Sequence, residues 1–115
     1  MPNPSRTIRY AAHNANNAQA TVTVGGNPGE TVGVLKIIAG YDRFPIGPHD
    51  RLLWIHVHRH GVMYPLTIPM EQTGVVLIDF AEGELQADEG RKITVSLTAS
   101  GETGNWSRVN TIYSV

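Results

Sequence analysis

Polar and apolar residues alternate without a break from position 92 to position 99, and this run constrains the fold more than any other part of the chain. Its apolar members are Ile93, Val95, Leu97 and Ala99. Successive side chains of a strand point to opposite faces, so the run predicts a strand with one buried face. After a turn-forming break at 100–105, the segment VNTIYSV at 109–115 predicts a second strand. A chain that closes on such a pair is typical of an all-β sandwich or barrel.

Shorter runs of the same kind occur upstream and predict further strands. They span residues 7–11, 20–24, 31–39, 52–60, 64–68 and 74–80. In the third of these runs, an outward Lys36 places Leu35, Ile37 and Ala39 on the buried face. The intervening segments are rich in glycine, proline and aspartate or, at 81–90, in acidic residues, and we expect them to be loops. The chain thus offers about eight strands at the spacing of a β-sandwich, and no segment has a helical period.

Size and composition favour one domain. The 115 residues include no cysteine, which excludes a disulfide framework and thiolate zinc sites. Residues 1–19 are polar, and we expect a flexible N-terminal arm there, with one short strand at 7–11, before a β-sandwich domain at 20–115. No apolar run has the length of a signal peptide or a membrane span, so we expect synthesis in a cytosol. The formal net charge of −1 gives no general attraction to nucleic acid or membranes.

Three histidines alternate along the strand predicted at 52–60. His56, His58 and His60 share one face of that strand. Residues at i and i+2 lie roughly 7 Å apart, so two imidazoles can meet at one metal ion, whereas His56 and His60 at roughly 13 Å cannot. A metal site would need further ligands, such as His49. We favour a polar strand face or a contact between subunits over a metal centre.

Trp54 shares that face and admits two interpretations that the sequence leaves open. An exposed aromatic ring on a sheet often marks a sugar-binding or protein-binding surface, since it buries much area at little entropic cost. In the alternative interpretation, the indole closes one end of the sandwich core.

Signatures of catalysis are missing from the sequence. The turn GGNPGET at 25–31 places Glu30 where a phosphate-binding loop has lysine, and no helix follows it, so we expect a plain β-turn. The acidic residues at 79–89 match no calcium motif, and we expect them to be solvated. No serine, histidine and acid arrangement is evident, and a thiol nucleophile is excluded. We therefore expect neither enzyme activity nor a cofactor.

The order of these segments resembles that of small tailed-phage capsid decoration proteins, which have a jelly-roll, tumour-necrosis-factor-like β-sandwich. In such chains an apolar strand ending in a small residue is followed by a Gly-led strand, then by a strand that runs into an Ala-Ser-Gly turn, and last by a Tyr-containing terminal strand. The matching positions here are Ala39 and Gly40, 74–80, 93–101 and 109–115. The likeness spans residues 20–115 and consists of strand pattern and turn placement.

The resemblance implies a structural virion protein that is made in the host cytoplasm and sits on the outside of an assembled phage capsid. It would bind the major capsid protein, cement neighbouring subunits and associate with itself, preferably as a homotrimer. Our candidate interface residues are Arg6, Arg9, Trp54, His56, His58 and His60. Two other functions stay open: a lectin-like carbohydrate-binding module that uses Trp54 and the histidine face, and a small metalloprotein of the cupin kind.

Overall fold

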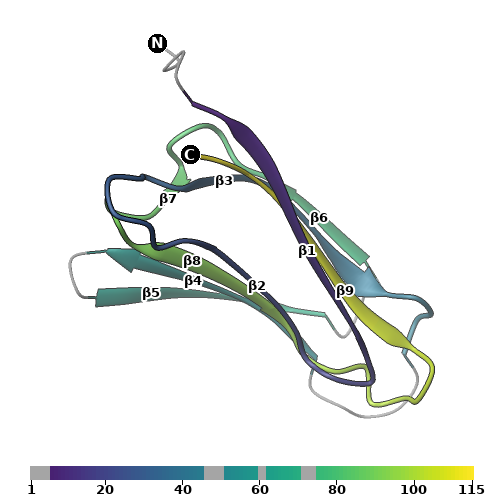
Figure 1. Ribbon diagram of the computed structural model, residues 1–115. Helices are drawn as coiled ribbons and strands as arrows, with labels where there is room; N and C mark the ends of the chain where they lie inside the picture. The colour runs from purple at the N-terminus through teal and green to yellow at the C-terminus, as the bar shows by residue number, and fades with distance from the viewer. Residues whose placement is uncertain (1–5, 46–50, 60–61, 71–74) are drawn as a thin grey trace.

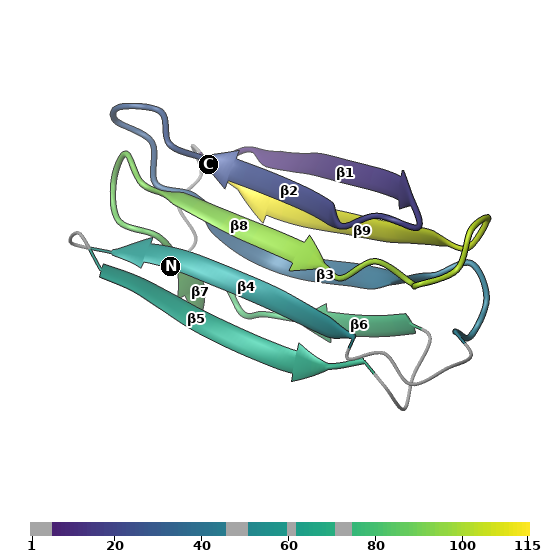
Figure 2. The same ribbon diagram turned by 90° about the horizontal axis from the view of Figure 1, so that it is seen from below.

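Two antiparallel sheets pack face to face in the computed structural model, which describes residues 6–45, 51–59, 62–70 and 75–115 (Figure 1). The strands in this part of the chain are β1 (Ile8–Asn16), β2 (Ala20–Gly25), β3 (Gly33–Tyr41), β4 (Leu52–Arg59), β5 (Val62–Pro69), β6 (Val75–Asp79), β7 (Leu85–Gln86), β8 (Lys92–Leu97) and β9 (Trp106–Ser114). One sheet has the order β1-β9-β3-β6, with β7 also paired to β3, and the other has the order β2-β8-β4-β5. Figure 2 shows the two layers. The predicted all-β sandwich is confirmed, and the described residues contain no helix that could cross a bilayer.

The strand pairing has the order of a jelly roll. The first strand pairs with the last, the second with β8, β3 with β6, and β4 with β5. Rolling up one long antiparallel hairpin produces this set of pairs. The short β7 continues the line of β6, because Gly33 and Val34 pair with β7 where 36–40 pair with β6. The jelly-roll-like architecture expected from the sequence is therefore confirmed.

Apolar side chains from both sheets fill the space between the layers. In β4 the alternate residues Leu53, Ile55 and Val57 are at most 2% exposed. The inward residues of β8 are equally buried, so the alternation at 92–97 corresponds to the two faces of this strand, whereas Ala99 lies beyond its end and is half-buried. Burial of this kind contributes roughly 25 cal/mol for each Å² of apolar surface removed from water. The core further includes Val22, Val24, Val32, Val34, Ile37, Ala39, Met70 and Val109.

The register of β3 agrees with the expectation at Lys36 and departs from it at Leu35. Lys36 lies outward and forms an ion pair with Asp79 at 3.4 Å, while Ile37 faces the core. The pairing of β3 with β9 shifts between Val34 and Lys36, which inserts Leu35 as an extra residue. Leu35 is therefore half-buried rather than part of the core.

Strand β1 differs from the flexible arm with one short strand that we expected at 1–19. It pairs with β9 in register from Ile8 to Asn16. Its inward face packs Ala11 and Ala15 against the core, and His13 Nδ1 accepts a hydrogen bond of 2.9 Å from the Thr21 N–H. This bond joins β1 to β2 and so links the two sheets at one side of the sandwich. The backbone hydrogen bonds with β9 order a segment whose own side chains show no apolar alternation.

The glycine-rich turn and the acidic segment can be compared with the loops that the sequence predicts. In the glycine-rich turn, the Glu30 N–H donates to the Asn27 carbonyl at 3.2 Å, which confirms a β-turn. The acidic segment is a loop except for β7, and the terminal strand begins at Trp106, three residues earlier than the pattern predicts.

Candidate interaction surfaces

The outer face of the β2-β8-β4-β5 sheet carries the aromatic and histidine residues singled out in the sequence. Trp54, His56 and His58 lie on this face and are half-buried. Trp54 pairs with Ser96, and His56 pairs with Thr94. Because Trp54 is outside the buried core cluster, the structure favours the surface interpretation of this residue over the core-closing one.

His56 and His58 share this face, and no third metal-ligating side chain lies with them among the described residues. Within that part of the chain, no group of three or more His, Asp or Glu side chains could hold a metal ion. His49 and His60 lie outside the described residues. Arg59, on the opposite side of β4, donates from Nε to the Gln86 carbonyl at 2.7 Å.

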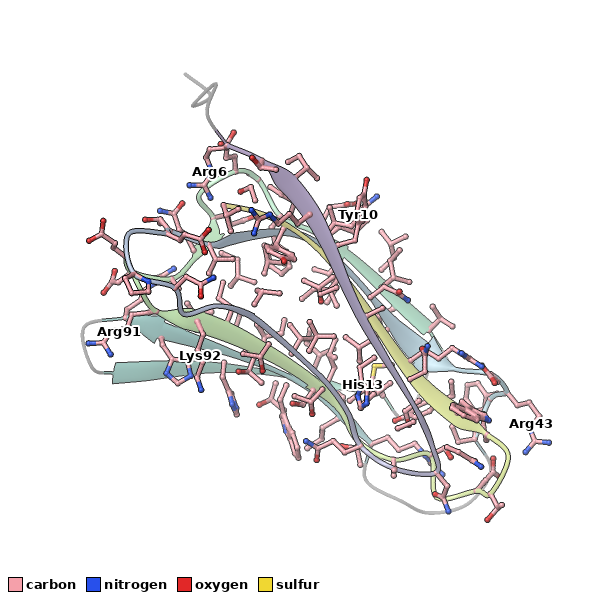
Figure 3. The ribbon with its side chains drawn as sticks, viewed as in Figure 1. Arg6, Tyr10, His13, Arg43, Arg91 and Lys92 are labelled. Carbon is pink, nitrogen blue, oxygen red and sulfur yellow. The ribbon has the colours of Figure 1, made fainter. Side chains whose placement is uncertain are left out.

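A hollow of about 210 Å³ lies where β4 and β8 meet the glycine turn. It is lined by Gly26, His58, Gly90, Arg91 and Lys92. Figure 3 shows Arg91 and Lys92 at this end of the sandwich. The backbone N–H groups of Gly26 and Gly90 already donate to carbonyls of the chain, so they do not form an anion cradle.

The two arginines expected in the arm have different surroundings. The Arg6 guanidinium donates to the Ser114 hydroxyl at 2.8 and 3.1 Å and lies 3.8 Å from a Glu82 carboxylate oxygen. It thus fastens the start of the chain to its own terminal strand. Arg9 is exposed on β1.

The outer face of the β1-β9-β3-β6 sheet carries several exposed apolar side chains among polar and charged ones, which sequence reasoning did not single out. Outward residues alternate with the inward ones on each strand, and their cross-strand pairs place them side by side. Tyr10 is 77% exposed, Leu77 58% and Val75 57%. We call this surface the apolar face, and it consists of Tyr10, Ile38, Val75, Leu77, Ile112 and Trp106.

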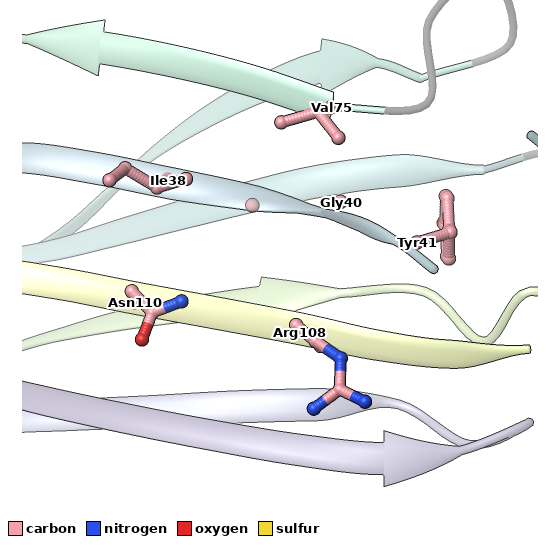
Figure 4. A pocket seen from close by; sticks show the side chains of 7 residues that line it. Ile38, Gly40, Tyr41, Val75, Arg108 and Asn110 are labelled. Carbon is pink, nitrogen blue, oxygen red and sulfur yellow. The ribbon is translucent and has the colours of Figure 1, made fainter. Parts of the chain in front are cut away.

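A hollow of about 170 Å³ opens into the apolar face at Gly40 (Figure 4). Gly40 has no side chain and lies between Val75 of β6 and Arg108 of β9 in the cross-strand row. Ile38 and Asn110 form the neighbouring side of the hollow. Gly40 is not among the glycines with positive φ, so the absent side chain, rather than backbone freedom, is the notable property of this position.

Charges on and beside the apolar face are paired within the chain. Lys36 pairs with Asp79, and the Arg108 guanidinium donates two hydrogen bonds to the Asp42 carboxylate, one of them 3.0 Å long. These bonds from Arg108 hold the pKa of Asp42 below its ordinary value. Arg108 also lies over the Trp106 ring, 5.5 Å from its centroid. The face therefore carries both signs of charge in neutral pairs.

Tyr41 lies behind the hollow and should ionise at unusually high pH. It is 5% exposed, and its hydroxyl donates to the Thr98 carbonyl at 2.9 Å. Burial raises its pKa to about 12, against the opposing charge of Arg51. The folded state thus favours the neutral phenol, so this contribution to stability is complete below pH 10 and is lost as the pH rises towards 12.

An alkaline titration followed by tyrosinate absorbance measures the ionisation of Tyr41. We expect a late phase that is missing in Tyr41→Phe and kept in Tyr10→Phe, since Tyr10 is exposed. A Tyr41→Phe titration identical to that of the unchanged chain would contradict the assignment.

One signal for the apolar face is present in the sequence. The residues Val75, Val76, Leu77 and Ile78 form an unbroken apolar run, which leaves apolar side chains on both sides of a strand. The remaining members of the face lie on three other strands. Only the pairing of β1, β9 and β3 shows that Tyr10, Ile112 and Ile38 belong to the same surface.

Comparisons with known proteins give matches among solved structures. No family model matches the chain, and no curated protein matches it. A solved structure of the virus-like particle of extra small virus, from the giant freshwater prawn Macrobrachium rosenbergii, is similar at 14% sequence identity. The match covers 99% of this chain and 82% of that chain, with a TM-score of 0.32.

Proposed function

We propose that this chain is a structural virion protein that binds the outside of an assembled phage capsid and cements neighbouring capsid subunits. The observation that carries the proposal is the apolar face, because large apolar side chains that are exposed together on one surface often mark a site of protein–protein interaction. The likeness of the segment order to capsid decoration proteins supplies the kind of partner. The chain then acts by adhesion, without a catalytic step or a cofactor.

The fold suits such a task. A core filled from both sheets holds the surface residues rigidly, and the pairing of β1 with β9 fixes Tyr10 on one side of the molecule. A preorganised surface loses little conformational entropy when it binds. Several modest contacts made at once on a lattice also bind more tightly than any one of them.

Carbohydrate binding through Trp54 is the competing proposal. Trp54 and its histidine neighbours are available on an outer face. Neither of the hollows described above includes Trp54 in its lining, however, and sugar sites are generally concave. We therefore rank adhesion first.

Co-sedimentation tests the proposal. The purified chain is mixed with assembled shells of its proposed partner, the major capsid protein, and, separately, with the unassembled subunits. We expect it to pellet with shells and to remain apart from free subunits, because the contacts span neighbouring subunits. Trp54→Ala should still pellet.

Two results would contradict the proposal. One is that the chain does not pellet with the shells at any concentration. The other is a chain whose melting temperature rises with a particular sugar and returns to its starting value in Trp54→Ala, which would favour the carbohydrate-binding alternative.

A further inference from the structure

Strands β1, β6, β2 and β5 are the outermost strands of the two sheets. An outermost strand leaves backbone N–H and C=O groups without a partner on one side, which makes it a template for pairing with another chain. In an antiparallel ladder these groups belong to every second residue, because the alternate residues bond the neighbouring strand. The register of each strand thus determines which of its residues present free backbone groups at the edge.

Three of the four edges are protected or short. In β5 the Met70 N–H donates to the Arg51 carbonyl at 2.7 Å, so positions 65, 67 and 69 face away from β4. Proline occupies the first and the last of these positions and has no N–H to offer. In β2 the Thr21 N–H donates to His13 Nδ1. Strand β6 spans only five residues.

Strand β1 has the longest free edge among the described strands. Thr7 and Val115 exchange N–H···O=C bonds of 2.9 and 3.0 Å at the end of the ladder with β9. The odd-numbered residues of β1 therefore bond β9, and the even-numbered ones face away from it. All nine residues pair in register without a bulge, and none is proline. Within residues 6–45, 51–59, 62–70 and 75–115, no acceptor meets the N–H groups of Ile8, Tyr10, Ala12, Asn14 and Asn16.

This free edge borders the apolar face. Tyr10 belongs to that face, and Ile8 lies on the same side of β1 and is 51% exposed. Strands β1 and β2 diverge from the turn that joins them (Figure 1), so the first half of β1 has no described strand on its free side. A protein that lies on the apolar face therefore also meets the edge of β1.

We propose that β1 accepts an extended segment of the capsid partner as an additional strand of the β1-β9-β3-β6 sheet. The inference rests on the proposed function, because it states how that partner is held. A strand in this place would donate to the free carbonyls of the even-numbered residues and accept from their N–H groups. Main-chain bonds of this kind supply affinity whatever the sequence of the added strand, and its side chains supply specificity.

The side chains of β1 indicate the chemistry of that segment. On the outer side, Ile8 and Tyr10 would have apolar cross-strand neighbours in the added strand. On the other side, Arg9 is exposed and has no ion pair within the described ranges. A carboxylate opposite Arg9 would complement its charge. We therefore expect an alternating segment with apolar residues on one side and an acidic residue on the other.

Charge also favours a segment of the partner over the β1 strand of a second copy. Strand β1 has the sequence IRYAAHNAN, which contains Arg9 and no acidic residue. A second β1 could satisfy the free backbone groups, but it would bring no carboxylate to Arg9 and would add another positive charge to the edge.

Co-sedimentation with assembled shells over a range of chain concentrations tests the inference. Ala12→Pro removes an N–H that has no acceptor in the free chain, so this variant should melt close to the unchanged chain. It should bind shells at least about tenfold more weakly, because an added strand loses a main-chain bond and is displaced by the proline ring. Ala12→Thr keeps the N–H and should bind as the unchanged chain does. Ile8→Pro and Ile8→Thr form a second pair of this kind, for which we expect the same difference.

Charge reversal tests the acidic residue separately. Arg9→Glu should weaken shell binding, since it sets two carboxylates opposite each other, whereas Arg9→Lys should leave it nearly unchanged. Equal binding of these two variants would contradict a carboxylate at that position.

Several outcomes would overturn strand addition at β1. They are proline variants that bind shells as tightly as their threonine controls, threonine controls that bind as weakly as the proline variants, and a melting temperature of Ala12→Pro far below that of the unchanged chain. A dimer of the free chain that Ala12→Pro dissociates would make a second copy the occupant instead. If the unchanged chain pellets in these experiments, the proposed function stands without this inference, whereas a chain that never pellets refutes both.

Discussion

Replacing Ile55 with alanine should lower the free energy of unfolding by about 2–5 kcal/mol. Ile55 is fully buried at the centre of β4, between Leu66 of β5 and Val95 of β8. Truncation removes buried apolar surface and leaves a cavity that sheets fixed on both sides cannot close. Urea denaturation followed by circular dichroism measures the difference.

His56→Ala is the matched control, one residue along the same strand. The His56 side chain lies on the outer face, so we expect a change within about 0.5 kcal/mol. A loss for His56→Ala as large as that for Ile55→Ala would contradict the assignment of the two faces of β4. It would then mean that the histidines are structural rather than part of a surface.

Gly25→Ala should lower the free energy of unfolding nearly as much, because of the backbone geometry at this position and the close packing around it. Gly25 has a φ of 84°, and an added Cβ would lie 2.5 Å from Val32 Cγ1 and 2.8 Å from the Arg91 carbonyl oxygen. The left-handed backbone costs alanine about 1–2 kcal/mol, and the forced displacement of neighbours adds roughly 1–3 kcal/mol. We expect a total loss of about 2–5 kcal/mol in the same denaturation experiment.

Gly29→Ala separates the cost of the left-handed backbone from the cost of the close contacts at Gly25. Gly29 lies in the same turn with a φ of 80°, and nothing lies within 4 Å of its added Cβ. It should therefore lose the backbone contribution alone, about 1–2 kcal/mol. If the two variants were equally stable, the close packing of β2 against Val32 and Arg91 would be wrong.

The residues that determine the core could be recognised in the sequence because their signal is local. The alternation at 92–97 becomes the two faces of β8, and Ile55 and His56 fall on opposite faces of β4 as the pattern predicts. Each such prediction depends on strand geometry alone, which a run of eight residues is enough to reveal.

Strand β1 and the apolar face could not be predicted in the same way. The inward residues of β1 include Ala11 and Ala15, which are too small to give an apolar signal, and β9 supplies the hydrogen bonds that order the strand. Tyr10 and Gly40 are thirty positions apart, and only the pairing of β1, β9 and β3 places them on one surface. Such long-range pairing is a property of the topology and is not encoded in any single segment.

The candidate interface residues also divide into those that a local pattern could place and those that it could not. Alternation correctly places Trp54, His56 and His58 on one strand face, which the structure assigns to the outside of the second sheet. The expected arm residue Arg6 is instead held by Ser114, a contact across 108 positions of sequence. No local pattern could have indicated it.

The thermal stability of assembled shells tests the cementing function most directly. Shells of the proposed partner, the major capsid protein, are heated with and without a saturating amount of this chain, and their disassembly is followed by light scattering. A protein that binds the assembled lattice and not its free subunits must shift disassembly to higher temperature, so we predict a rise that grows with the concentration of the chain. Shells that bind the chain and still disassemble at the unchanged temperature would contradict cementing.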